Sequence, residues 1–221
     1  MITKYSIDSE VIEFMHELFL QNFVKLFVAI DPIALIPIFA SLSSKIPIDK
    51  IFKLGIIMFL VSLFLLIFFV VFGNALLDII GISIASFQIA GGIFLFIIAF
   101  EMLFEKRSKR KEKLVDKKIN EDFLIAFIIF PITIPLIIGP SAITLSILIS
   151  ENFSFNFLNL YTKILPIFVV ITFTVLIFIT SKITASFLGK FPVLILQKIF
   201  GIILGSLAIE FVLNGIRLSE L

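Results

Sequence analysis

Long apolar runs separated by short polar segments make up almost the whole chain. The runs extend over about residues 18–42, 54–77, 82–104, 123–149, 164–180 and 193–213. A helix of roughly 17–25 apolar residues crosses a hydrocarbon core about 30 Å thick. The pattern therefore predicts an all-α membrane protein with six transmembrane helices.

Composition supports the same class of protein. Hydrophobic residues make up 60% of the chain and charged residues 15%, against roughly 25% charged residues in a soluble domain. The chain has no cysteine, which excludes disulfides and thiolate metal sites. One strongly hydrophilic stretch divides the chain, so we expect a first three-helix unit (residues 1–104), a loop (105–122) and a second three-helix unit (123–221).

Lysine and arginine are distributed unevenly over the predicted bundle. Fourteen of the 18 lie in the first, third and fifth loops, and eight of these lie between Lys106 and Lys118. The positive-inside rule places these loops in the cytoplasm and both termini on the other side of the cell (inner) membrane. Loop 105–122 also carries acidic residues, and such mixed charge is what orientation alone requires. The expected partners are therefore a lipid bilayer and a small solute, and no nucleic acid.

The two units share a weak internal repeat. Residues 88–101 match residues 197–210 at six of fourteen positions, including glutamine, glycine and glutamate. The first spans of the two units align at an offset of 108, which places Asp31-Pro32 on Gly139-Pro140. Because each unit has an odd number of spans, the two must have opposite orientations in the bilayer. Two inverted three-helix repeats are typical of secondary transporters, although duplication also occurs in membrane proteins with other tasks.

Both aligned motifs interrupt a transmembrane helix. Asp31 lies in an otherwise apolar run, and an ionisable group at membrane depth is costly and rarely idle. Proline removes a backbone donor and breaks the helical ladder, so we expect helices 1 and 4 to be broken at Asp31-Pro32 and Gly139-Pro140. Broken backbone is tolerated at this depth only where protein or a water-filled cavity surrounds it. The pattern predicts a polar site at the midplane, between the two breaks.

Each candidate residue has a functional and a structural interpretation. Asp31 can bind a cation, a proton or a substrate ammonium group, or it can cap a half-helix that starts beside Pro32. The freed helix end at Gly139 can hold a carboxylate, whereas the hydroxyls of this segment can instead bond neighbouring helices. The predicted substrate-binding residues are Asp31, Pro32, Ala34, Gly139, Pro140, Ser141 and Thr144.

Two further acids lie near the ends of spans three and six. Glu101 and Glu210 are interpreted as interfacial caps or partners of basic residues, and, together with Asp31, as candidates for coupling to a proton or a sodium ion. Motifs of metalloproteases, serine hydrolases and P-loop enzymes are absent, and an aspartyl intramembrane enzyme needs a second facing acid that Asp31 lacks. We therefore expect no enzymatic activity, no metal and no cofactor. The oligomeric state stays open.

Several stretches along the chain resemble the MarC family of multi-pass inner-membrane proteins. They are Lys25-Leu26-Phe27 with Ile30-Asp31-Pro32 and Ile36-Pro37-Ile38-Phe39; Gly81-Ile82-Ser83 to Phe87 with Ile89-Ala90-Gly91-Gly92; Ile134-Pro135-Leu136 with Gly139-Pro140 and Ala142-Ile143-Thr144; and Gln197 to Gly215. The resemblance implies six spans, kinship with small exporters of the lysine-exporter type and, from some relatives, transport of small neutral amino acids such as alanine and glycine. This chain departs from the family pattern by having Ala34-Leu35 in place of Gly-Asn, Ser141 in place of Gly, and Gln88 in place of Arg.

The leading hypothesis is a secondary transporter of small polar solutes, with small neutral amino acids as the expected class. The second is a membrane scaffold that transports nothing, and an intramembrane enzyme has the weakest support. A wetted pocket between spans one and four favours transport, whereas a closed interior there favours the scaffold.

Overall fold

A computed structural model describes residues 2–43, 46–104, 124–187 and 190–219, without the side chains of residues 2–9, 182–187 and 190. Regular structure in these ranges is entirely helical. The elements are α1 (Ile2–Ile30), α2 (Ile36–Ser43), α3 (Ile48–Ile80), α4 (Ile84–Leu103), α6 (Leu124–Phe127), η2 (Ile128–Ile137), α7 (Pro140–Ile149), α8 (Phe157–Asn159), η3 (Leu160–Ile164), α9 (Leu165–Phe187) and α10 (Lys190–Ser219). The predicted basic loop 105–122 lies outside the described residues.

Four stretches are long and apolar enough to cross a membrane, as far as the described residues go: Ile48–Ile80, Ile84–Leu103, Phe157–Ser181 and Phe191–Ser219. A fifth crossing consists of Leu124–Ile137 and Pro140–Ile149, which are bent by 64°. The predicted first span is not among them. α1 ends at Ile30, and its apolar part from Leu18 onward measures only about 20 Å at 1.5 Å per residue. A crossing of that region therefore needs α2 on the far side of the break.

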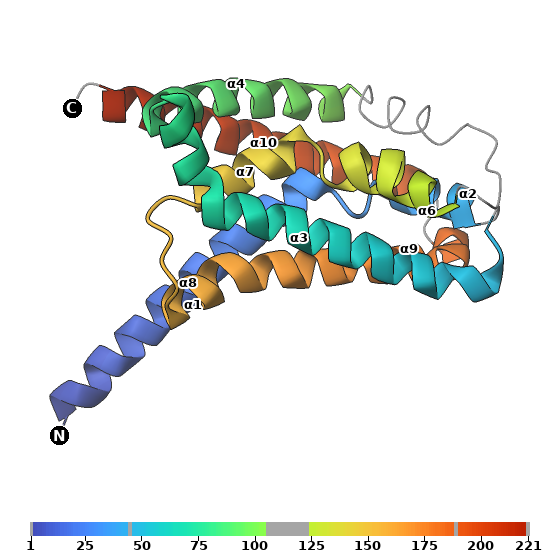
Figure 1. The fold of residues 1–221 in the computed structure, drawn as a ribbon, viewed down its shortest axis with the longest axis horizontal. Helices are drawn as coiled ribbons and strands as arrows, with labels where there is room; N and C mark the ends of the chain where they lie inside the picture. Colours follow the sequence, from blue (N-terminus) through green and yellow to red (C-terminus); the bar gives the residue numbers. More distant parts are fainter. Residues whose placement is uncertain (1, 44–45, 105–123, 188–189, 220–221) are drawn as a thin grey trace.

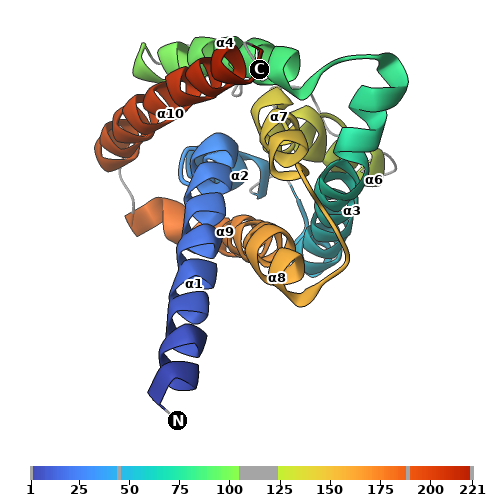
Figure 2. The same cartoon turned by 90° about the vertical axis from the view of Figure 1, so that its left-hand side faces the viewer.

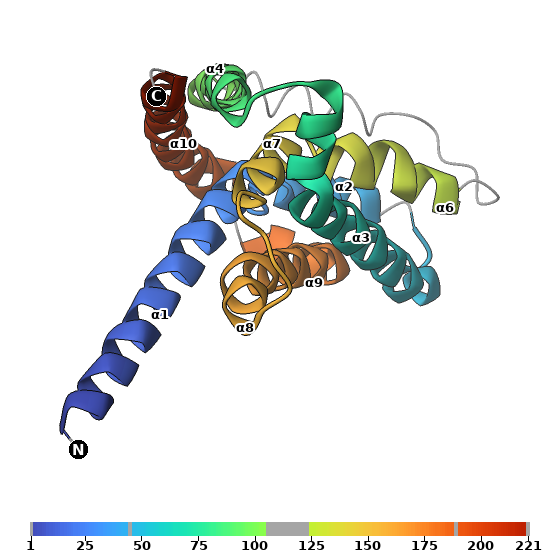
Figure 3. The same ribbon diagram turned by 60° about the vertical axis from the view of Figure 1, so that its left-hand side comes forward.

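The helices α3, α4, α9 and α10 share one long axis, to which α1 is oblique (Figure 1). In Figure 1, α3 and α9 lie side by side, and α4 and α10 form a second pair above them. Seen end on, the α4–α10 pair lies to one side of the group formed by α1, α2, α3, α7 and α9 (Figure 2). The first turns of α1 project away from the bundle (Figure 3). Both chain ends lie at the same end of the molecule, which suits an even number of crossings.

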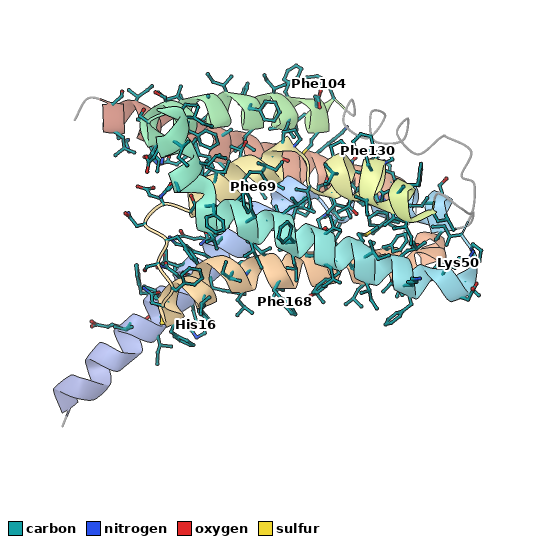
Figure 4. The ribbon with its side chains drawn as sticks, in the orientation of Figure 1. His16, Lys50, Phe69, Phe104, Phe130 and Phe168 are labelled. Carbon is teal, nitrogen blue, oxygen red and sulfur yellow. The ribbon has the colours of Figure 1, made fainter. Side chains whose placement is uncertain are left out.

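Polar residues mark the two ends of this axis. His16 and Lys50 lie near opposite ends of the bundle, with Phe69 and Phe168 between them (Figure 4). At the end near the chain termini, Tyr161 Oη lies 2.7 Å from His16 Nδ1, and Asn22 Nδ2 donates to the Thr162 carbonyl at 2.8 Å. Because these groups prefer water or headgroups, we take the long axis as the direction across the membrane.

The turn from α3 to α4 follows directly from local sequence. Gly81 has φ 77°, which suits glycine, and its N–H bonds back to the carbonyl of Asp78 at 3.1 Å, which ends α3. Ser83 caps α4, because its Oγ accepts from Ser86 N–H at 3.1 Å. This short turn sends α4 back along the bundle towards its partner α10.

Small residues let α4 and α10 approach closely. A Cβ on Gly92 would lie 2.7 Å from the Ala208 carbonyl oxygen, and a Cβ on Gly201 would lie 3.2 Å from that of Ala99. The order of these contacts shows that the two helices run antiparallel. Glycine is therefore required here for space, in the way usual for packed membrane helices.

Candidate functional site

The first break ends α1 at mid-bundle. Asp31 has φ 57°, and its N–H donates to the Phe27 carbonyl at 2.9 Å, so it occupies the left-handed position just past the helix end. A tight turn follows, in which Leu35 N–H donates to the Pro32 carbonyl at 3.2 Å. α2 starts only at Ile36. The interpretation of Asp31 as the cap of a helix that starts beside Pro32 is therefore corrected, because Asp31 closes the preceding helix.

The Asp31 carboxylate is buried and only partly satisfied. Its residue is 0% exposed, and Oδ1 accepts a long hydrogen bond of 3.4 Å from Ala34 N–H. Oδ2 is buried with no hydrogen-bond partner among the described residues. Leaving a buried polar atom unmatched is costly, and such exceptions call for an explanation. An acid at this depth is by default a candidate functional group.

The second break is an irregular stretch followed by a fresh helix start. Within η2, Phe130 and Ile134 have extended backbone angles, as expected for residues that precede proline. Thr133 helps to satisfy the freed backbone, since its Oγ1 donates to the Ile128 carbonyl at 2.8 Å. α7 then starts at Pro140, with Gly139 before it at φ −80°. Gly139 needs no unusual angle, but a Cβ there would lie 3.1 Å from the Pro135 carbonyl oxygen.

The two breaks contact each other directly. Ser141 Oγ, in the first turn of α7, donates to the Ala29 carbonyl in the last turn of α1 at 3.0 Å. The partial negative charge at the end of α1 thus meets the partial positive charge at the start of α7. Asp31 lies two residues after Ala29, so its carboxylate belongs to the same junction. We call these last residues of α1 and first residues of α7, with Asp31 and Gly139, the junction.

The junction is closed in this conformation. Asp31 is 0% exposed, and Ala34 and Ser141 are 1% exposed. Pro32 and Gly139 are buried too, whereas Pro140 is exposed. An occupant would therefore have to displace packed side chains or enter in another conformation.

The remaining predicted site residues lie elsewhere. Thr144 turns towards α4, where its Cγ2 would be 2.6 Å from a Cβ placed on Gly91. Glu101 is half-buried on α4 and Glu210 is exposed on α10. Both acids therefore belong to the α4–α10 pair, which lies beside the helices that form the junction (Figure 2). The two acids are about nine residues apart along this antiparallel pair, or roughly 14 Å.

Two polar contacts between the units were missed by the sequence reasoning. Asn74 Nδ2 donates to the Ser150 carbonyl, and Ser150 Oγ donates to Asn74 Oδ1, both at 3.1 Å. At the other end of the bundle, Ser181 Oγ donates to Ser43 Oγ at 2.9 Å and lies 3.2 Å from the Phe39 carbonyl oxygen. We call these the Asn74 latch and the Ser181 latch. Nothing local distinguishes these side chains from ordinary packing residues in an apolar run.

Two serines, like the Asp31 carboxylate, have a buried oxygen atom without a hydrogen-bond partner among the described residues. Ser62 on α3 and Ser146 on α7 are 0% exposed, and neither Oγ has a hydrogen-bond partner in the described part of the chain. A search of the same residues finds no group of three or more His, Cys, Asp or Glu that could hold a metal ion.

Comparison with known proteins places this sequence in a family. The sequence model described as "MarC family integral membrane protein" matches residues 16–219. A UPF0056 membrane protein of Buchnera aphidicola from Baizongia pistaciae is 32% identical over 206 residues, which cover 93% of this chain and 95% of the relative. Another, from Bacillus subtilis, is 28% identical over 196 residues, covering 88% and 92%. No solved structure matches. The chain is thus a multi-pass integral membrane protein, and it belongs to the MarC family.

Proposed function

We propose that the protein is a secondary transporter of small polar solutes, with small neutral amino acids as its substrate class. The observation that carries the proposal is the Asp31 carboxylate, fully buried beside a broken helix with Oδ2 unmatched among the described residues. An acid in this setting stabilises nothing on its own, and it gains a partner when a cationic group enters the junction.

A zwitterion matches the two sides of the junction. The ammonium group of an amino acid would bond to Asp31 at the negative end of α1. The carboxylate would bind at the positive end of α7, where Ser141 offers its backbone N–H and its hydroxyl. The space is small, because Ala34 and Ala142 are both fully packed. This favours a short side chain, as in glycine or alanine.

Reciprocal contacts support two inverted three-helix repeats. Gly92 and Gly201 are equivalent in the sequence alignment, and so are Ala99 and Ala208. Gly92 packs on the Ala208 carbonyl, and Gly201 packs on the Ala99 carbonyl. Likewise α7 packs on α3 while α2 packs on α9. Buried positions also recur at the offset of 108: Leu54, Met58, Ser62, Leu66, Val70 and Gly73 in α3, and Thr162, Pro166, Val170, Thr174, Phe178 and Ser181 in the other repeat. Such symmetry allows one repeat to rock against the other around a fixed midplane site.

Each of the two latches would hold the junction closed towards one side of the membrane during transport. The Asn74 latch joins α3 to the end of α7, and the Ser181 latch joins α9 to the end of α2. They lie at opposite ends of the bundle (Figure 1), and each ties one repeat to the other. Opening one latch at a time would expose the junction to one side of the membrane and then to the other.

Coupling and topology complete the proposal. Asp31 is the group placed to take up a proton or a sodium ion with the substrate, while Glu101 and Glu210 would act as interfacial partners of basic residues. The termini would face away from the cytoplasm of the cell (inner) membrane, and loop 105–122 would face into it. The proposal assigns no catalytic reaction and no cofactor to the chain.

Proteoliposomes test the proposal. Purified protein should catalyse uptake or efflux of labelled alanine and glycine above the rate of empty liposomes. Asp31→Asn and Gly139→Leu should lower flux at least about tenfold, whereas Asp49→Asn, which changes an exposed acid on α3, should leave it intact. Absence of flux across a broad panel of small solutes, with correctly folded protein, would refute transport.

A membrane scaffold is the second candidate, and one observation favours it. The junction residues Asp31, Ala34 and Ser141 pack without exposed surface in this conformation. A scaffold predicts that the junction stays closed under all conditions, so a reagent that modifies thiols would never reach a cysteine placed there. A transporter predicts intermittent access from each side.

A further inference from the structure

A groove runs along the outer surface between α1 and α10. It has a volume of about 360 Å³, and apolar side chains such as Val24 and Val28 of α1 and Leu207 of α10 line it. The α1 side of the groove extends from Leu20 to Val28, which is about 12 Å along the helix axis. Because α1 leads obliquely from the polar end of the bundle towards its middle (Figure 1), the groove has the length and the inward course of part of a lipid acyl chain.

A single cation lies at this groove. Lys25 lines it and is half-buried, and no hydrogen bond or ion pair of Lys25 occurs within the described residues. The neighbouring Gln21 already donates to Glu17 Oε1 at 3.2 Å. A lysine beside hydrocarbon without a carboxylate partner needs an anion or water for its ammonium group.

Lys25 also lies at a suitable depth. It follows Asn22, whose amide bonds the Thr162 carbonyl in the polar layer at this end of the bundle, by less than one helical turn. A lysine side chain is long enough to reach from this position to the headgroup region. A phosphate above the groove would therefore meet the ammonium group while its acyl chain fills the groove below.

We infer that the groove between α1 and α10 is a binding site for an anionic phospholipid, with the acyl chain along Val24 and Val28 and the phosphate on Lys25. A second copy of the chain fits less well, because the groove is lined by bulky residues. Close helix association in membranes uses small residues, and Gly92 and Gly201 are already occupied between α4 and α10. The inference rests on α1 and α10 alone and does not depend on transport.

Native mass spectrometry of the full chain tests the site. The protein is released from micelles that contain equal amounts of phosphatidylglycerol and phosphatidylcholine with identical chains. One lysine near a membrane surface contributes about 1 kcal/mol, so wild type should retain the anionic lipid in about fivefold excess. Lys25→Gln should reduce this ratio to about one, whereas Lys53→Gln, which removes an exposed lysine on α3, should leave it unchanged.

Two further measurements separate the contribution of the lipid acyl chain from that of the headgroup. Val24→Phe fills the groove and should lower retention of both lipids, and Val24 is 39% exposed, so the larger side chain has room without unfolding. Glycerol phosphate, which has the headgroup chemistry without acyl chains, should not displace the lipid. The site is refuted if Lys25→Gln keeps the fivefold preference, if Val24→Phe binds lipid like wild type, if glycerol phosphate competes, or if the protein leaves the micelle as a lipid-free dimer.

Discussion

The two breaks fall at aligned positions of the predicted repeats, yet they present opposite helix ends to the junction. Asp31 closes the 29-residue helix α1 and brings a carboxylate to its negative end. Gly139 and Pro140 open the ten-residue helix α7 and bring no charge to its positive end. Ser141 joins the two through the Ala29 carbonyl. The two aligned positions thus differ in charge, and in the proposed site one would meet a cation and the other an anion.

The two latches show the same divergence. The contact of Gly73 with Ile147 and that of Ser181 with Phe39 are related by the offset of 108 in both partners. In the first repeat the position is a glycine, and the neighbouring Asn74 makes the hydrogen bonds. In the second repeat the serine at the position itself makes them. The two aligned contacts therefore pack in the same way but carry different polar groups, and substitutions can separate the shared packing from the individual hydrogen bonds.

The largest effect is expected from Asp31→Asn. Asparagine keeps the size of the side chain and can still accept from Ala34 N–H, but it cannot pair with an ammonium group. Losing a hydrogen bond to a charged group typically removes about 1.5–3 kcal/mol, so initial alanine flux should fall about 10- to 100-fold. Size-exclusion behaviour should be that of wild type. Flux within twofold of wild type would remove Asp31 from the site.

Alanine substitutions of the glycines between α4 and α10 should destabilise the fold most where the added methyl group has the least space. Gly92→Ala places a methyl group 2.7 Å from a backbone carbonyl and should destabilise the fold by about 1–3 kcal/mol, the usual range for overpacking. Gly201→Ala, at 3.2 Å, should cost less. Gly205→Ala is the matched control, because its methyl group would meet Ala99 Cβ at an ordinary 3.6 Å. Thermal unfolding in detergent measures the order, and equal melting temperatures for all three variants would contradict the reciprocal packing.

The latches should give the smallest and most directional effect. The natural chain has no cysteine, so Ser146→Cys introduces one buried reporter on α7. Adding Asn74→Ala should raise its labelling by an impermeant maleimide from the side of the chain termini. Adding Ser181→Ala should raise it from the opposite side. One hydrogen bond contributes about 1 kcal/mol, so each substitution, which removes at least one hydrogen bond, should change the labelling rate at least about fivefold.

Oriented membrane vesicles separate the two sides in this experiment. The Ser146→Cys protein without a latch substitution supplies the baseline rate. If both latch variants increased labelling from the same side, or if neither did, the latches would have no part in opening the junction.

The sequence predicts where α1 ends and where α7 starts, because the causes are local. Pro32 disfavours helical backbone at Asp31, and Pro140 sits well at the first position of a new helix, so α1 must end and α7 can start there. Local preference does not choose between extended and left-handed backbone at Asp31, and the left-handed conformation, with φ 57°, places Asp31 just past the end of α1 and not at the start of a new helix. The cap interpretation of Asp31 was wrong for this reason.

Long-range placement was less predictable. The first apolar run reads as one span, but the turn at Asp31 divides it between the apolar end of α1, about 20 Å long, and the eight-residue helix α2, and neither part crosses a membrane alone. The latches bring together residues 76 and 138 positions apart, for which a single sequence carries no signal.

Competition binding to the purified protein tests whether the junction is a binding site for a zwitterion. Labelled alanine is displaced by unlabelled alanine, by ethylamine, which lacks the carboxylate, and by propionate, which lacks the ammonium group. We expect wild type to favour alanine strongly over both analogues. Asp31→Asn should lose the preference over propionate and keep that over ethylamine, whereas Ser141→Ala should weaken only the preference over ethylamine. If both variants changed both preferences equally, or if wild type bound propionate as tightly as alanine, the junction would not be the zwitterion site.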